Sequence, residues 1–64
     1  MKMHELVARK RATKRTSPAY KRLQAAIDAR AALLGADFHN LRQAQVHFDT
    51  VLAELYQHHP EMRP

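Results

Sequence analysis

Apolar side chains recur at intervals of three or four residues along two segments of the chain. The first row consists of Tyr20, Leu23, Ala26, Ile27, Ala31 and Leu34. The second row consists of Phe38, Leu41, Ala44, Phe48, Val51, Leu52 and Leu55. This interval places the apolar side chains of a segment on one face of an α-helix, whereas a half-buried strand alternates apolar and polar residues. The pattern therefore predicts an all-α protein.

The first of the two helices has recognisable start and stop signals. Ser17 is an N-cap residue, and Pro18 suits the first helical position because its missing N–H would be unsatisfied there anyway. Gly35 is expected just past the last turn, where glycine commonly ends a helix. The sequence therefore predicts a helix over about residues 18–34.

The second helix is expected over about residues 37–59. Asp37 is its predicted N-cap, and Pro60 stops it. A connection of two or three residues makes the two helices antiparallel neighbours, so they form an αα-hairpin. Folding the chain at that point would bring Leu23 close to Phe48.

Residues 3–15 are expected to form a third, weaker helix. Its large apolar side chains are limited to Met3, Leu6 and Val7, which provide one turn of packing surface. This basic helix or arm precedes the hairpin in what we expect to be one small domain. The expected boundaries are 1–64 for the domain, 1–16 for the basic N-terminal helix or arm, and 17–60 for the hairpin.

A hairpin by itself leaves half of each apolar face in water. The chain has 64 residues and no cysteine, and one core in such a small chain rarely contributes more than ~3–5 kcal/mol. Two hairpins are therefore expected to pair into a dimeric four-helix-type bundle, unless another protein fills the open groove. The residues assigned to this seam are Tyr20, Leu23, Ile27, Leu34, Phe38, Leu41, Phe48, Leu52 and Leu55.

Two polar residues, Arg30 and Gln45, interrupt the apolar rows. Polar interruptions of this kind can fix the register of a dimer. Alternatively, Arg30 lies along the apolar surface with its guanidinium in solvent. The sequence leaves both interpretations open.

Positive charge is concentrated at the start of the chain. The formal net charge is +5, yet residues 1–22 hold eight of the eleven Lys and Arg against Glu5 alone, while residues 23–64 hold three Arg against five Asp and Glu. A cluster of this kind favours an anionic partner, and nucleic acid is the leading hypothesis because phosphate contacts release counterions. The expected contact residues are Arg9, Lys10, Arg11, Lys14, Arg15, Lys21 and Arg22.

Two other interpretations of the basic segment remain open. It can dock on an acidic surface of a larger protein, which would make the chain an inhibitor or adaptor of the phage or plasmid accessory type. It can also be a solvated tail whose cations complement a helix C-terminus. In architecture alone, a hairpin of about this length resembles the Rop type of RNA-binding bundle, although the two sequences do not correspond.

The junction of the two predicted helices also resembles a helix-turn-helix motif. Ala31 stands four positions before Gly35, the spacing of the small residue and the turn glycine in that motif. Arg30 and Phe38 depart from it, because they occupy positions that are normally apolar and polar respectively. In that motif the second helix reads the major groove. The residues that the resemblance would place there are Asp37, His39, Arg42 and Gln43.

Enzymatic chemistry has little support in the sequence. The single glycine excludes glycine-rich phosphate loops, and the absence of cysteine removes thiol nucleophiles and thiolate ligands. The five histidines form no i,i+4 pair that would hold a metal on one helical face. We therefore expect a non-enzymatic protein with no metal and no cofactor.

No apolar run in the sequence reaches the roughly 18 residues that a membrane span needs. The N-terminus is basic, but no uninterrupted apolar stretch follows it, so a secretory signal is not expected. The expected location is the cytoplasm, without membrane contact.

Overall fold

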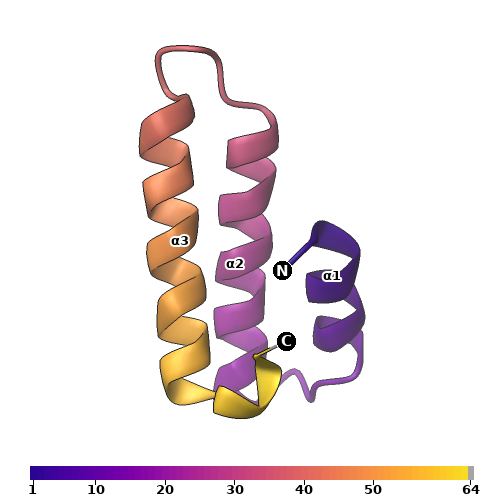
Figure 1. Cartoon of the computed structure of the whole chain (residues 1–64). Coiled ribbons are helices and arrows are strands. Elements are labelled where there is room, and N and C mark those ends of the chain that lie inside the picture. Colours follow the sequence, from indigo (N-terminus) through magenta and orange to yellow (C-terminus); the bar gives the residue numbers. More distant parts are fainter. Residues whose placement is uncertain (64) are drawn as a thin grey trace.

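The computed structural model describes residues 1–63, which contain three helices and no strand. They are α1 (Met3–Arg11), α2 (Pro18–Leu34) and α3 (Leu41–His58), and a short 3₁₀ helix, η1 (Pro60–Met62), follows them. In Figure 1, α2 stands between the other two helices, and α3 runs antiparallel to it. The predicted all-α class and the helical hairpin are confirmed.

Helix α2 has the predicted bounds, because its signals are local. The backbone N–H of Ala19 donates to Ser17 Oγ at 3.2 Å, and Pro18 occupies the first turn. Gly35 ends the helix with φ −95° and ψ 1°. Gly35 therefore ends the helix as expected, although with a negative φ and not in the left-handed conformation that glycine often adopts at this position.

Helix α3 begins four residues later than predicted. Asp37 does not cap it; its Oδ1 accepts hydrogen bonds from the backbone N and from Nδ2 of Asn40, both at 3.0 Å. These bonds close a separate turn, so Leu41 becomes the first helical residue. The helix ends at His58, directly before the residue that precedes Pro60. The connection between α2 and α3 is therefore longer than expected.

The longer connection changes which residues face each other. The guanidinium of Arg30 lies over the ring of Phe48, 5.3 Å from its centroid. Nearer the other end of the hairpin, Arg22 Nη1 lies 3.4 Å from His59 Nε2. Phe48 is thus level with Arg30, about two helical turns from Leu23. The predicted pairing of Leu23 with Phe48 is wrong.

Helix α1 is shorter than the predicted 3–15, because it ends at Arg11. Thr13 Oγ1 donates to the carbonyl oxygen of Arg9 at 2.7 Å, and the Thr13 backbone N–H turns to Lys10 O at 3.1 Å. Hydroxyl groups that bond the backbone in this way compete with helix continuation. Like charges at i and i+4 in this segment act in the same direction.

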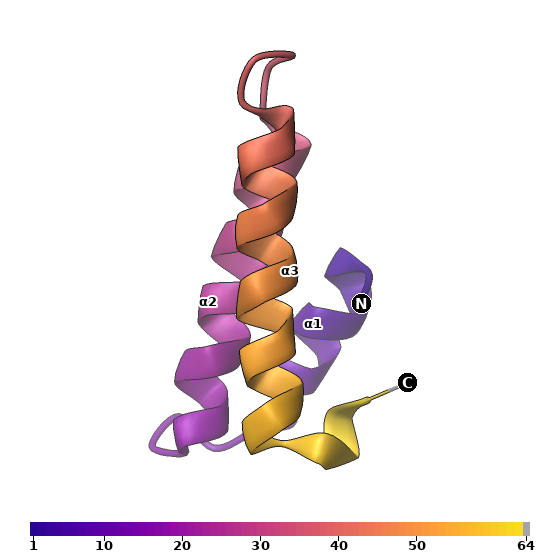
Figure 2. The same ribbon diagram turned by 60° about the vertical axis from the view of Figure 1, so that its left-hand side comes forward.

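The core is centred on α2. The side chains of Leu6, Leu23 and Leu55, one from each α-helix, are 0% exposed. Among the described residues the backbone of α1 approaches α2 but not α3, and η1 packs against α3. Figure 2 shows η1 turning from the end of α3 towards the side on which α1 lies, and Met62 of η1 is buried. The complete set of buried residues is Leu6, Ala19, Leu23, Ala26, Ala29, Leu33, Phe48, Leu55 and Met62.

None of the helices within residues 1–63 combines the length and apolar character needed to cross a bilayer.

Leu55→Ala tests the core. Removing a fully buried leucine side chain costs about 2–5 kcal/mol, which approaches the whole stability expected of a chain this small. Urea unfolding followed by circular dichroism should therefore show a large loss of stability. Val46→Ala is the control, because Val46 is 57% exposed and should change stability by less than about 0.5 kcal/mol. Equal losses in the two variants would contradict the assignment of Leu55 to the core.

Gly35→Ala tests the backbone at the end of α2. A Cβ at this position would meet only the carbonyl oxygen of Ala31, at an ordinary 3.6 Å. Because the φ of Gly35 is negative, alanine fits without strain and lowers the entropy of the unfolded chain. We expect G35A to raise the free energy of unfolding by about 0.4–1 kcal/mol. A destabilised variant would indicate a left-handed glycine instead.

Candidate nucleic-acid interface

The seven predicted contact residues lie in three consecutive parts of the chain. They come from the C-terminal half of α1, the connection to α2 and the N-terminal part of α2. All three parts lie at the end of the molecule opposite the α2–α3 connection (Figure 1). We call the following residues the basic end: Arg9, Lys10, Arg11, Lys14, Arg15, Lys21 and Arg22.

Two cations of the basic end are held in place by side-chain contacts. Lys10 Nζ lies 5.3 Å from the ring centroid of Tyr20, a cation–π geometry that joins α1 to α2. Arg22 Nη1 donates to Nε2 of His59 at 3.4 Å, which joins α2 to the end of α3. Both side chains are half-buried, while the other five cations are exposed. The basic end thus combines two fixed charges with five that are free to meet a ligand.

The hydrogen bond from Arg22 also defines the state of His59. A guanidinium has only donors, so Nε2 of His59 must be unprotonated to accept. The other ring nitrogen, Nδ1, lies 3.8 Å from Glu61 Oε1. The imidazole therefore carries its proton on Nδ1, facing the carboxylate.

The cations of the basic end have no carboxylate partner in the described chain. Among residues 1–63 no Lys or Arg side chain lies within ion-pair distance of a carboxylate, and Glu61 approaches only the neutral ring of His59, at 3.8 Å. Glu5 is the one acidic residue near the basic end in sequence, and its Oε1 accepts the backbone N–H of Lys2 at 3.4 Å instead. The positive charge at this end is consequently not neutralised within residues 1–63.

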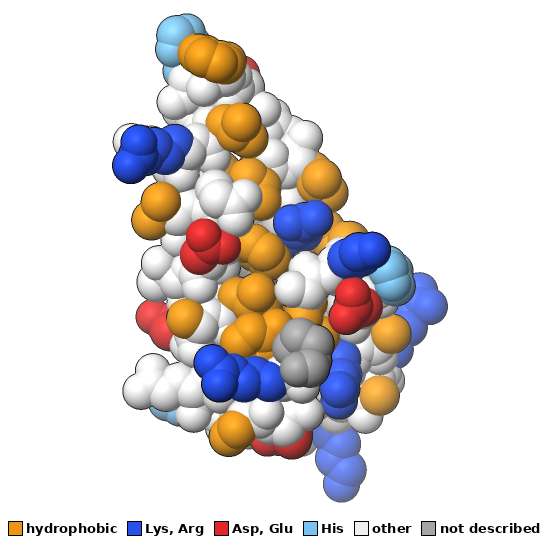
Figure 3. Space-filling view, in the orientation of Figure 1, with side chains coloured by type: hydrophobic (Ala, Val, Ile, Leu, Met, Phe, Trp, Pro, Cys, Tyr) orange, Lys and Arg blue, Asp and Glu red, His pale blue; other side chains and the backbone are white. Residues whose placement is uncertain are grey.

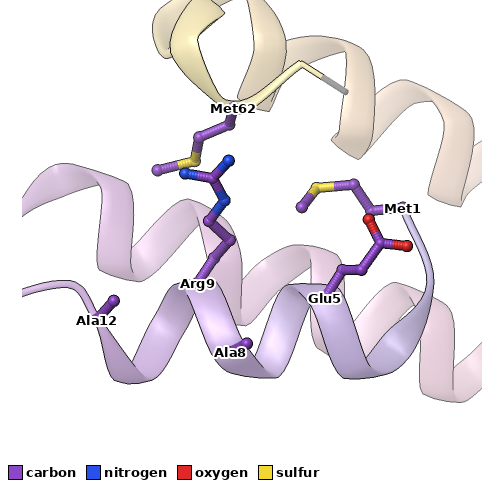
Figure 4. Close-up of a pocket in the computed structure, with 6 residues that line it drawn as sticks. All are labelled: Met1, Glu5, Ala8, Arg9, Ala12 and Met62. Atoms are coloured by element: carbon purple, nitrogen blue, oxygen red, sulfur yellow. The ribbon is translucent and has the colours of Figure 1, made fainter.

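A shallow pocket of about 320 Å³ lies beside the basic end, between α1 and η1. In Figure 4 the side chain of Arg9 extends from α1 towards Met62, and Glu5 points to the side of Met1. The pocket walls therefore carry one negative and one positive side chain, together with the thioethers of two methionines. Because the carboxylate offsets the guanidinium, this pocket is not an anion-binding site. The complete lining is Met1, Glu5, Ala8, Arg9, Ala12 and Met62.

The pocket was not visible in the sequence. Its outer wall depends on Met62, which lies beyond Pro60 and outside both apolar rows. The apolar row stops at the proline because the helix does, whereas the chain turns back through η1 and buries Met62. A lone methionine after a helix-ending proline is a weak signal for such a contact.

Tyr56 of α3 faces the same region. Burial raises its pKa above the usual 10.0, the negative charge of Glu5 adds to the rise, and Arg63 opposes it. The guanidinium of Arg63 lies 5.8 Å from the Tyr56 ring centroid. The pKa of the Tyr56 phenol therefore depends on the positions of α1, which carries Glu5, and of the C-terminal residues, which include Arg63.

The residues that the helix-turn-helix resemblance would place in the major groove lie opposite the basic end, at the α2–α3 connection. His39 is in the turn before α3, and Arg42 and Gln43 are in its first turn. All three are exposed. Helices α2 and α3 lie side by side (Figures 1 and 2), whereas the helices of a helix-turn-helix cross at about 90–120°. The hairpin does not present these side chains in the way that motif requires.

The nine residues assigned to the dimer seam separate into three groups. Leu23, Phe48 and Leu55 are buried within the chain's own core, Tyr20, Ile27 and Leu52 are half-buried, and Leu34, Phe38 and Leu41 are exposed. Three of the nine residues therefore belong to the chain's own core, and the assignment of the nine to a dimer seam stays a prediction. The chain itself covers the end near α1, and the surface left open lies at the α2–α3 connection.

Comparisons with known proteins add no family or function: no protein-family model, curated protein or solved structure matches this chain. Residues 1–63 contain no group of three or more His, Cys, Asp or Glu placed to hold a metal ion. The geometry of the basic end is therefore the basis for a functional proposal.

The titration of Tyr56 is predicted for the variant Tyr20→Phe, in which Tyr56 is the remaining tyrosine. Ultraviolet absorbance of the phenolate should give a midpoint above 10.0. Adding Glu5→Gln should lower this midpoint, because it removes a negative charge that opposes ionisation. A midpoint that Glu5→Gln leaves unchanged would contradict the position of α1 near Tyr56.

The same shift has a consequence for stability. Because the pKa of Tyr56 is raised in the folded chain, its contribution is fully present below about pH 10 and is lost as pH rises through the folded value. Urea unfolding at increasing alkaline pH should therefore show a loss of stability that Tyr56→Phe reduces.

Proposed function

We propose that this chain is a small, non-enzymatic protein that binds nucleic acid by contacting backbone phosphates through its basic end. The strongest support is that the positive charge of the basic end is not neutralised by the protein's own acidic side chains. No Asp or Glu within residues 1–63 forms an ion pair with these cations. Seven cations that repel one another at one end of the molecule raise the energy of the free protein. A row of phosphates would relieve that repulsion.

The position of Lys21 and Arg22 supports the same conclusion. They are the fourth and fifth residues of α2, close to the helix N-terminus, where the helix dipole disfavours positive charge. Within the fold, Arg22 has only the neutral ring nitrogen of His59 as a partner. A bound phosphate would supply the negative charge that this helix start lacks.

The contacts proposed are with phosphates rather than with stacked bases. Tyr20 is the aromatic residue in contact with the basic end, and its ring is half-buried beneath Lys10. A platform for single strands needs exposed aromatic rings on which successive bases stack. We therefore propose modest sequence preference, since phosphate contacts position a protein without reading bases.

The proposal also includes the location, the oligomeric state and the alternative partner expected from the sequence. The protein would act in the cytoplasm as a homodimer, so that two basic ends serve one binding unit. The alternative partner is an acidic surface of a larger protein, to which the same cations would bind. The salt series below distinguishes the two kinds of partner.

Arg15→Gln and Arg42→Gln form a matched pair for testing the interface. Both remove one exposed arginine, but Arg15 lies in the basic end and Arg42 at the opposite end of the molecule. Binding to a DNA duplex and to an RNA duplex is measured over a series of salt concentrations. Arg15→Gln should reduce the slope of log affinity against log salt by about 1, and Arg42→Gln should leave it unchanged.

Two results would refute this function. One is the absence of binding to either nucleic acid at low salt. The other is an equal change of slope in the two variants, which would show a response to net charge rather than contact at the basic end. In the first case, capture of an acidic protein by the wild-type chain, lost in Arg15→Gln, would support the alternative.

A further inference from the structure

The stripe of α2 that faces α1 is covered along only part of its length. Tyr20, Ile27 and Leu34 are seven residues apart, so they lie on one side of α2. Tyr20 is covered by Lys10 of α1. Ile27 is half-buried, and Leu34 is 67% exposed. Helix α1 has nine residues and α2 has seventeen, so α1 is too short to reach the upper part of this stripe.

The facing stripe of α3 shows the same gradient. Leu41, Phe48 and Leu55 are also seven residues apart; Leu55 is 0% exposed and Phe48 is 3% exposed, but Leu41 is 49% exposed. Phe38, in the turn between the helices, is 90% exposed. In Figure 3 hydrophobic side chains continue from the connection at the top down between the two helices. We call Ile27, Arg30, Leu34, Phe38 and Leu41 the tip surface.

Arg30 adds an unpartnered charge to the tip surface. Its guanidinium covers the Phe48 ring at 5.3 Å. Its Nε is buried and has no hydrogen-bond partner among residues 1–63. Burial of an unsatisfied donor is costly, and more so when the group is charged. A carboxylate brought to this surface from outside would pair with the positive charge of the guanidinium.

An acidic residue stands at the same level on α3. Asp49 follows Phe48 directly and is exposed, and its Oδ1 accepts a hydrogen bond from Gln45 at 2.9 Å. It forms no ion pair with Arg30 or with another cation of residues 1–63. Asp49 on α3 therefore adds a negative charge beside the positive charge of Arg30 on α2, and we include Asp49 in the tip surface from here on.

We infer that the tip surface binds a second copy of this chain, in parallel, with Arg30 of each copy paired to Asp49 of the other. A two-fold axis along the hairpin places α2 of one copy opposite α3 of the second, so both charge pairs form at once and the two apolar stripes meet. The surface is self-complementary, because it has exposed apolar side chains and one charge of each sign. Nucleic acid offers no such complement.

The proposal sets a size for the interface. A standard interface buries roughly 800 Å² on each partner, about one sixth of the 4761 Å² of accessible surface. The interface proposed here would therefore include the upper turns of both helices as well as their connection. In the parallel arrangement both basic ends lie on the same side of the dimer, and this consequence rests on the proposed function.

The pairing is tested by sedimentation equilibrium with charge-reversed variants. Wild-type protein should be a dimer, and Arg30→Glu and Asp49→Arg should each weaken self-association at least tenfold. An equimolar mixture of the two variants should dimerise again, because both contacts of the mixed dimer then join one acidic and one basic side chain. Val46→Ser is the control, since Val46 is exposed about 140° around α3 from Leu41. It should leave the dimer unchanged.

Circular dichroism establishes that each variant keeps its helices. If Arg30→Glu loses its helices, the test uses Leu34→Ser and Asp49→Arg instead, because both change exposed side chains. Each of these two variants should weaken the dimer at least tenfold. Wild-type protein that stays monomeric up to roughly 100 μM overturns the inference, as does unchanged association in Asp49→Arg. Nucleic-acid binding by a monomeric variant at low salt separates the failure of this interface from failure of the proposed function.

Discussion

The whole fold depends on α2 being covered from two sides by helices whose backbones do not approach each other. Leu23 and Ala26 are 0% exposed, and they can be buried only because α1 and α3 both pack against α2. The alanines that α2 contributes to the core, at positions 19, 26 and 29, are small and allow close approach of a neighbouring helix. The length of each neighbour then decides how much of α2 is shielded from water.

That constraint divides the molecule into two ends with different chemistry. Where α1 covers α2, the side chains that continue beyond the short apolar turn of α1 are cations, and they lie at the surface without carboxylate partners among residues 1–63. At the α2–α3 connection, which α1 does not reach, Leu34, Phe38 and Leu41 are left exposed. A polar ligand suits the first end and an apolar one the second, so the two proposed interfaces do not compete for the same surface.

The sequence predicted best what is decided locally. The start of α2 follows from Ser17 and Pro18 and its end from Gly35, and the effects of these residues do not depend on distant parts of the chain. The start of α3 was wrong because Asp37 had two local options, and its bonds to Asn40 close a turn before the helix. The register error followed from that, since the length of the connection sets which residues of α3 meet α2. The seven cations of the candidate site were identified from sequence alone, and the structure gathers them at one end. The partners that hold two of them, Tyr20 and His59, were not identified, because such contacts require the three-dimensional packing.

The binding proposed for the basic end would also be linked to the stability of the fold. Helix α1 packs on α2 with Leu6 as its one buried side chain, and Lys10 lies over Tyr20 near its end. Repulsion among the cations opposes this docking, whereas bound phosphates would remove the repulsion and favour the helix. A ligand that binds the folded state alone stabilises it in proportion to the logarithm of its concentration. Since a core of this size contributes only ~3–5 kcal/mol, even modest binding is a large fraction of the total. A nucleic acid would then act as part of the structure, because it supplies the negative charge that residues 1–63 do not place beside their cations.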